Sequence, residues 1–255
     1  MALFALRDIP EISPGDDLAE VISTGIAREG LRLEEGDVVV VTQKIVSKAE
    51  GCLVNLNSVA PSSNALALAD RTGKDPRLVE VILRESRAVV RERPGLLIME
   101  TRHGWICANA GVDRSNVAEV DAEVALTLPV DPDASARRIR EGLRAKAARD
   151  GPPPDIAVIV TDSHGRAWRL ATVNLAIGVA GMQPIADFRG QTDRFGYTLR
   201  VTTVARADEL AAAAGLLSGQ AAESLPVVII RGATWPRGDG RATDMQRPAE
   251  KDLFR

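Results

Sequence analysis

The first candidate for chemistry is the short polar segment 113–116, which follows a run of small residues. Asp113 and Asn116 are three residues apart and can point at one centre if the backbone turns between them. Their oxygens are hard ligands of the kind that magnesium or manganese binds. A second interpretation is that Asp113 caps a turn through Ser115 or Asn116, and the residue types alone favour this cap.

A similar combination follows the apolar run 156–161, where Asp162 and Ser163 are succeeded by Arg166 and Arg169. Asp and Ser at a strand end offer two oxygen ligands. The two arginines could neutralise phosphate or carboxylate oxygens. This segment therefore indicates metal-assisted phosphoryl chemistry.

Two lysines and two hydroxyl groups follow another apolar run, in the segment 42–51. They could hold phosphates, but the glycines of a Walker A loop are absent. A plainer interpretation, a solvated basic strand end with a turn at Ser47 and Lys48, accounts better for the residue types.

In a fourth polar segment, 187–196, a hairpin tip with ion-paired charges is at least as plausible as substrate contact.

Several familiar catalytic patterns are missing from the sequence. It contains no Ser-His-Asp order, no GxSxG elbow and no CxxC pair, which disfavours hydrolase and thiol-redox chemistry. His103 and His164 have no companions at zinc-ligand spacing. We interpret both as structural residues or as neighbours of a functional residue.

Three β-branched runs are the elements expected to position these groups. Two of them directly precede polar segments, and the third is the last apolar run of the chain. The runs 36–42, 155–161 and 225–231 predict strands buried on both faces. Around them we expect helices over residues 16–29, 75–91, 135–149 and 207–217, and the second begins with Asp75-Pro76, a pair suited to an N-cap and first turn, and has apolar residues at helical spacing. The proline-rich stretch 150–154 predicts a connector or domain boundary, and residues 232–255 predict a loosely packed or disordered tail.

Composition limits the remaining function classes. The 255 residues are 45% hydrophobic, which allows one large domain or two intimate ones. With 32 basic and 35 acidic residues, no charge excess attracts nucleic acid or anionic lipid. The N-terminal residues do not resemble a signal peptide, and the longest uncharged stretch, 170–186, is too interrupted to span a bilayer. We therefore expect a cytoplasmic protein with no membrane or nucleic-acid partner.

The order of these segments resembles the coenzyme F-420 gamma-glutamyl ligase family, the CofE-like ligases, including the ligase half of the fused actinobacterial enzyme. The resemblance runs from about Ile9 to Gly232. It is carried by IPEISPGDDL, GDVVVVTQKIVSKAEG, DPRLVEVILRESR, ETRHGWICANAGVDRSNV, LPVDPDASA, VIVTDSHGRAWR, AIGVAG, DFRGQTDRFG and LPVVIIRG. A match over so many ordered segments is far more specific than any single motif.

The resemblance implies an α+β fold of two interlocked mixed α/β domains within residues 1–231, neither P-loop nor ATP-grasp, assembled as a homodimer. It also implies a GTP-dependent and metal-dependent ligase. Such an enzyme joins the amine of L-glutamate to the lactyl carboxylate of a deazaflavin precursor through an acyl phosphate, and can then add further glutamates through γ-carboxyl groups. Magnesium or manganese is the implied metal, and a potassium ion is left open.

The resemblance also assigns site residues by position, and it leaves the general base unassigned. The implied metal neighbours are Asp113, Asp162, Ser163 and Gln220. The implied nucleotide contacts are Ile9, Pro10, Glu11, Ile12, Gln43, Lys44, Lys48 and Asn116. Candidate charge stabilisers during transfer are Lys48, Arg166 and Arg169.

Two alternatives stay open at this point. The chain could be a related amide ligase with another amino acid or acceptor, or a non-catalytic module that binds deazaflavin or nucleotide. With only 3% aromatic residues, few side chains could stack on a deazaflavin ring. The candidates are Trp105, Trp168, Phe188, Phe195 and Tyr197.

Overall fold

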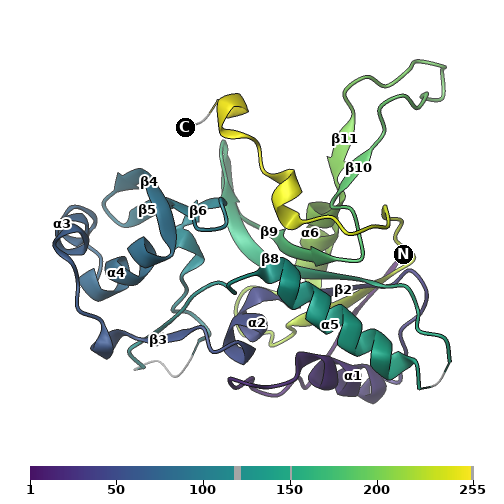
Figure 1. The fold of residues 1–255 in the computed structure, drawn as a ribbon, viewed down its shortest axis with the longest axis horizontal. Helices are drawn as coiled ribbons and strands as arrows, with labels where there is room; N and C mark the ends of the chain where they lie inside the picture. The colour runs from purple at the N-terminus through teal and green to yellow at the C-terminus, as the bar shows by residue number, and fades with distance from the viewer. Residues whose placement is uncertain (118–121, 150, 254–255) are drawn as a thin grey trace.

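The computed structural model describes residues 1–117, 122–149 and 151–253. Within this part of the chain, a mixed sheet of five strands has the order β1-β12-β2-β8-β9 (Figure 1). These strands are β1 (Ala2–Ala5), β2 (Val38–Thr42), β8 (Ala157–Arg166), β9 (Arg169–Ala180) and β12 (Val227–Arg231). β2 and β8 are parallel, and the other neighbours are antiparallel. The three strands predicted from β-branched runs are therefore confirmed.

Helices cover both faces of this sheet, which explains the continuous apolar runs Val38–Val41, Ala157–Val160 and Val227–Ile230 in its central strands. α1 (Leu18–Arg28) and α5 (Pro132–Ala147) pack on the face that presents Val39 and Val41. α6 (Arg206–Ser218) packs on the opposite face. A strand with helices on both sides gains from burying every side chain, so alternation with polar residues disappears.

The helix ends follow their capping residues. α1 begins after Asp17, whose carboxylate accepts the amide protons of Ala19 and Glu20. α5 begins three residues earlier than predicted, because Asp131 caps it and Pro132 occupies its first turn. The predicted helices in these two regions, and the one that becomes α6, are confirmed with small shifts of their ends.

The helix predicted over 75–91 is wrong in its second half. α4 (Pro76–Arg84) ends at Glu85, and the chain continues as strand β4 (Ser86–Arg93), which pairs with β5 (Leu96–Thr101). A turn at Gly95, where φ is +80°, allows this hairpin to form. Pairing with β5 therefore overrides the helical pattern that the sequence continues past residue 85.

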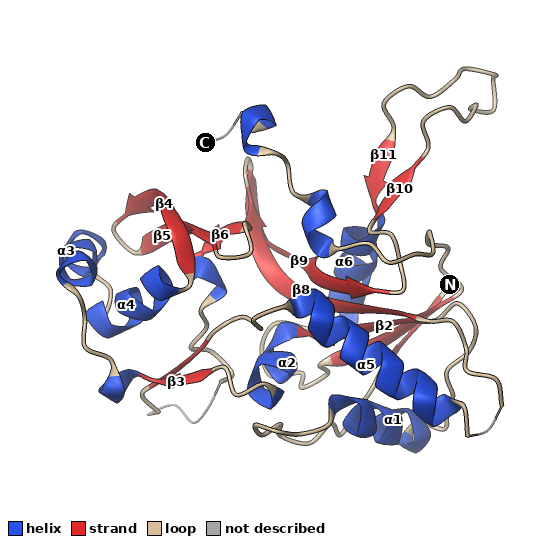
Figure 2. Ribbon diagram, viewed as in Figure 1, coloured by secondary structure: helices blue, strands red, loops and turns tan. Residues whose placement is uncertain are grey.

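A second group of elements lies beside the central sheet and has its own apolar core (Figure 2). It contains the sheet β4-β5-β6 and the small pair β3-β7. In these sheets, β3 spans Leu53–Asn55, β6 spans Ile106–Ala108 and β7 spans Val124–Leu126. The group also contains α3 (Ser63–Thr72) and the short 3-10 helices Leu56–Ser58 and Asn109–Gly111. The mixed α and β character that we expected is confirmed.

A hairpin projects from the central sheet. β10 (Ile185–Asp187) and β11 (Thr203–Ala205) form the base of a long hairpin that extends away from the rest of the chain (Figure 1). Within it Asp187 and Arg189 are ion-paired, so the hairpin interpretation of the fourth polar segment is confirmed.

The tail after β12 is held more closely than its composition suggests. Trp235 and Met245 pack against the core beneath α6, and Ala242, in the 3-10 helix Ala242–Met245, is buried. A last 3-10 helix spans Ala249–Lys251. Among the described residues, no helix has the length and apolar character needed to cross a bilayer.

Candidate active site

The polar segment after β2 is a helix, α2 (Gln43–Ala49), rather than a solvated strand end. Gln43, Ser47 and Lys48 are buried, and the Ser47 hydroxyl donates to Gln43 Oε1 at 2.8 Å. Lys44 and Lys48 are four residues apart and therefore lie on one side of this helix. β2 ends at Thr42, opposite Thr161 of the parallel strand β8, so α2 starts beside the residues of β8 that follow Thr161.

Asp113 turns toward α2 and is not engaged as the local turn cap that its residue type favoured. Its Oδ2 accepts a hydrogen bond from Gln43 Nε2 at 3.3 Å and lies 3.4 Å from Lys44 Nζ. Lys44 also donates to the carbonyl oxygen of Ser115 at 3.0 Å. The second polar segment is thus fixed against the first one.

The negative charge of Asp162 acts on Asp113. Burial raises the pKa of Asp113 above its ordinary range, the charge of Lys44 opposes this, and the negative charge of Asp162 raises the pKa further. Cys107, which is buried on β6, is affected by both carboxylates. Burial and the negative charges of Asp162 and Asp113 raise the pKa of its thiol to about 12. Two acidic residues from distant parts of the chain are therefore brought close to one another.

Ser163 and Gln220 form a separate polar group, because successive residues of β8 point to opposite faces of the sheet. The Ser163 hydroxyl lies 2.8 Å from Gln220 Oε1 and 3.0 Å from Asn174 Oδ1, and its single proton can serve one acceptor at a time. Gln220 Nε2 donates to the same Asn174 oxygen at 2.9 Å. The four predicted metal neighbours are thus arranged as two pairs.

The predicted nucleotide contacts surround α2 from two sides. Lys48 Nζ lies 2.5 Å from Glu11 Oε1, which joins the loop of residues 9–12 to the helix. Ile12 is buried in the core, whereas Glu11 is exposed. On the other side, Asn116 Nδ2 donates to the carbonyl oxygen of Ala221 at 2.8 Å, which connects the segment 113–116 to the chain beside Gln220.

Arg166 and Arg169 lie farther away, at the tip of the β8–β9 hairpin, where they are paired with each other. Arg166 is four residues beyond Asp162, a separation of about 13 Å at 3.3 Å per residue along a strand. Arg169 is exposed, and Trp168 beside it is 86% exposed. In the described structure, these arginines are not part of the group around α2.

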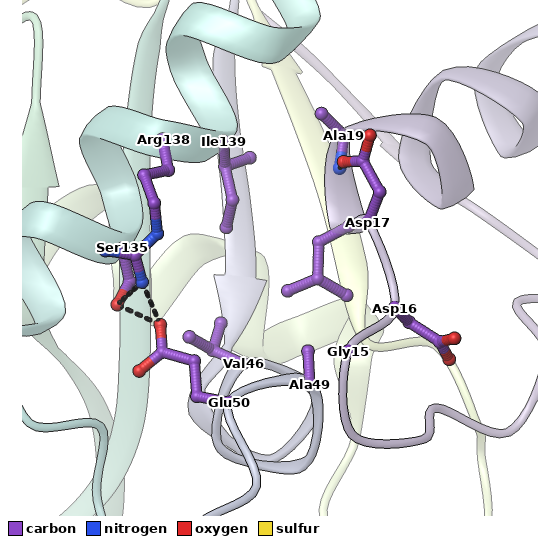
Figure 3. Close-up of a pocket in the computed structure, with 11 residues that line it drawn as sticks. Gly15, Asp16, Asp17, Ala19, Val46, Ala49, Glu50, Ser135, Arg138 and Ile139 are labelled. Carbon is purple, nitrogen blue, oxygen red and sulfur yellow. Dashed lines mark hydrogen bonds and ion pairs between the residues drawn. The ribbon is translucent and has the colours of Figure 1, made fainter.

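Two pockets flank this region. One, of about 280 Å³, lies between α1, α2 and α5, and Figure 3 shows the Glu50 carboxylate directed toward Ser135 and Arg138. The residues that line it include none of the predicted site residues. The other, of about 300 Å³, is lined by His164, Trp105 and Asp208 and therefore adjoins the acidic pair through His164.

Sequence reasoning missed one central residue. Asn174 is 5% exposed and accepts from the Ser163–Gln220 pair, but it lies in a stretch that we had not interpreted as a strand. No local signal marks this residue, because its role depends on its position opposite Ser163 in the β8–β9 hairpin. Of the aromatic candidates, Trp105 lines a pocket beside the site, whereas Phe195 and Tyr197 are exposed on the β10–β11 hairpin.

Comparisons with known proteins agree with this arrangement of motifs. The family described as F420-0:Gamma-glutamyl ligase matches residues 7–232. A protein named Coenzyme F420:L-glutamate ligase from Methanothermobacter thermautotrophicus is 46% identical over 100% of this chain and 99% of its own. Proteins of the same name from Methanopyrus kandleri and Methanocaldococcus jannaschii are 45% and 42% identical, covering 96% and 88% of this chain and 94% and 86% of theirs. The chain therefore belongs to the F420-0:gamma-glutamyl ligase family, as its motifs indicated.

Proposed function

We propose that this protein joins the amine of L-glutamate to the lactyl carboxylate of the coenzyme F-420 precursor, using GTP and a divalent metal. The relatives' name, Coenzyme F420:L-glutamate ligase, supports glutamate and F-420 as the substrate class. The observation that supports the mechanism is the setting of Asp113: its carboxylate lies 3.4 Å from Lys44 Nζ of α2, and the negative charge of Asp162 raises its pKa.

A divalent cation fits this acidic pair. Asp162 makes ionisation of Asp113 harder, and a cation between the carboxylates would relieve that repulsion. Carboxylate oxygens are the ligands that magnesium and manganese prefer. Among the described residues, no group of three or more His, Cys, Asp or Glu side chains is placed to hold a metal. The cation would therefore need further oxygens from water or from the nucleotide phosphates.

The pair Ser163 and Gln220 offers only neutral oxygens, with Asn174 as their common partner. Such a set suits a second divalent ion that is held mainly by phosphate, or a potassium ion. In either case these residues would orient the ion rather than neutralise it, because they carry no charge.

The lysines of α2 are the natural contacts for the triphosphate. Lys48 is 8% exposed and is paired with the exposed carboxylate of Glu11, so phosphate oxygens could take the place of Glu11. Lys44 is already shared between Asp113 and Ser115, and would bring a positive charge to the metal side of the nucleotide. Gln43 and Asn116 add amide donors, and the loop 9–12 borders the same helix.

These positions suit the activation of a carboxylate. A carboxylate oxygen of the acceptor attacks the γ-phosphorus of GTP, GDP leaves, and the acyl phosphate forms. The glutamate nitrogen then attacks the acyl carbon, phosphate leaves with the acyl oxygen that it carried, and the amine proton passes to phosphate or solvent. A bound divalent ion would supply charge stabilisation for the phosphoryl oxygens. Lys44 and Lys48 would hold the phosphates in line and offset their repulsion from the entering carboxylate.

The direct test incubates the protein with GTP, L-glutamate, magnesium and the F-420 precursor, and measures GDP and the glutamylated product. Asp162→Asn should fold nearly normally, because the amide oxygen can still accept the bond from His164, and should suppress ligation strongly. Normal turnover by this variant at ordinary magnesium concentrations would refute the metal assignment. Wild-type protein that binds GTP but releases no GDP would indicate a binding module instead.

Other expectations from the resemblance stay predictions. They are the homodimer, the interlocking of two domains, the addition of further glutamates, the cytoplasmic location and the roles of Arg166 and Arg169. Exchange of GTP for ATP in the same assay measures nucleotide preference.

A further inference from the structure

The carboxylate of Asp162 has a hydrogen-bond donor built beside it. His164 Nε2 lies 3.0 Å from Asp162 Oδ2. An ionised carboxylate has no proton to give, so the imidazole nitrogen donates and the carboxylate accepts. The two side chains are 6% and 12% exposed, so water competes little for this bond.

The strand itself sets up this contact. Residues i and i+2 of a strand project from the same face, so Asp162 and His164 emerge from β8 together. Pairing of His164 with Val173 on β9 holds the main chain at this point. The imidazole also lines the pocket shared with Trp105 and Asp208, so it is enclosed by side chains from other elements.

We propose that His164 is a positioning residue that holds Oδ2 of Asp162 and leaves the other carboxylate oxygen free for a divalent cation shared with Asp113. This inference rests on the proposed metal site. A carboxylate that can rotate must lose that freedom when it binds a cation, whereas one already fixed by a hydrogen bond has lost it on folding. Outer partners of this kind change metal affinity by about 10–100-fold when they are removed.

The other histidine provides a matched control. His103 Nε2 lies 3.0 Å from the carbonyl oxygens of Pro129 and Val130, and its ring stacks on Trp105 with 4.8 Å between the ring centroids. It is therefore a half-buried structural residue, with no bond to either acidic residue in the described structure. Substitution of His103 tests the loss of an imidazole as such.

The experiment titrates Mn²⁺ alone into the full chain and follows free Mn²⁺ by electron paramagnetic resonance. His164→Phe keeps a buried ring and removes the donor, and should weaken Mn²⁺ binding by about 10–100-fold. His164→Gln restores an N–H at similar reach and should return the affinity close to that of wild type. His103→Phe should bind Mn²⁺ like wild type. A merely structural role for His164 would lower the melting temperature but would not separate the Phe variant from the Gln variant in Mn²⁺ affinity.

A measurement on unmodified protein covers the case in which His164→Phe does not fold. The chain has two histidines, so their imidazole nitrogens can be resolved by long-range proton–nitrogen NMR. Addition of diamagnetic Mg²⁺ should shift the His164 Nε2 resonance and leave that of His103 in place. A His164 resonance that does not respond, while Mg²⁺ binding is detected by calorimetry, would overturn the proposal.

The outcomes separate this proposal from the proposed function. Equal Mn²⁺ affinity for wild type and His164→Phe, together with loss of binding in Asp162→Asn, overturns the role of His164 and leaves the metal site intact. Wild-type protein that binds no Mn²⁺ overturns both.

Discussion

Replacing Asn174 with alanine should cost more stability than the same change at Asn116, although both are asparagines with hydrogen-bonded side chains. Asn174 is 5% exposed, and its Oδ1 accepts from Ser163 and Gln220 at 3.0 and 2.9 Å. In the alanine variant the Ser163 proton can turn to Gln220, so between one and two bonds are lost, about 1–2 kcal/mol in all. The void left by the amide adds about 1 kcal/mol.

The expected total of about 2–3 kcal/mol can be measured by urea unfolding, followed by tryptophan fluorescence. With a slope of about 3 kcal/mol/M, the midpoint should fall by about 0.7–1 M. Asn116 is exposed and makes one bond to the carbonyl of Ala221, but its φ is +53°, a conformation that alanine adopts less readily, so Asn116→Ala should cost about 1 kcal/mol. Similar losses in the two variants would refute the view that burial of the Ser163–Asn174–Gln220 group sets its energetic weight.

Three further predictions concern groups around the acidic pair. Lys48→Ala should weaken GTP binding, measured by calorimetry. Glu11→Gln removes only the negative charge that competes for Lys48 and should not weaken GTP binding. Equal GTP affinities of the wild type and Lys48→Ala would contradict a contact between Lys48 and the nucleotide. Burial and the charge of Asp162 raise the pKa of Asp113 despite Lys44, so ionisation of Asp113 destabilises the folded protein as the pH rises above the ordinary aspartate range. A cation, however, binds only the ionised carboxylate. Asp113→Asn should therefore raise the urea midpoint at neutral pH and abolish Mn²⁺ binding, and the Mn²⁺ affinity of the wild type should fall as the solution becomes weakly acidic. An unchanged or lower midpoint would show that the ionised Asp113 carboxylate does not destabilise the fold. Since the pKa of Cys107 is about 12, its thiol should resist iodoacetamide at about pH 8 in native protein and react after unfolding, as peptide mass spectrometry would show.

The sequence predicted the scaffold well where the physical signal is local. Runs such as Val38–Val41 can be satisfied only by burial on two sides, and Asp75 can cap only the helix that follows it. Such signals need no knowledge of the rest of the chain. The helix predicted over 75–91 failed at Ser86 because its second half gains more from pairing with β5, which is information from another segment.

The candidate site divides in the same way. Residue types after β2 and β8 indicated phosphate and metal chemistry, and the order of motifs identified the family. The sequence could not distinguish Asp113 as a turn cap from Asp113 as an oxygen ligand beside Asn116, because both interpretations use the same local residues. The tertiary structure places Gln43 and Lys44 against the Asp113 carboxylate, so its contacts come from another segment and not from its own turn.

Long-range pairing also determined the residues that support the site. The register of the β8–β9 hairpin places Asn174 opposite Ser163, and the pleat of β8 directs His164 toward Asp162 and Ser163 toward Gln220. The amino-acid sequence by itself determined which side chains could bind a cation or a phosphate and which runs must be buried. Only the folded chain decided which of those side chains meet, because a hydrogen bond or a shared charge depends on distances between segments that are remote in sequence.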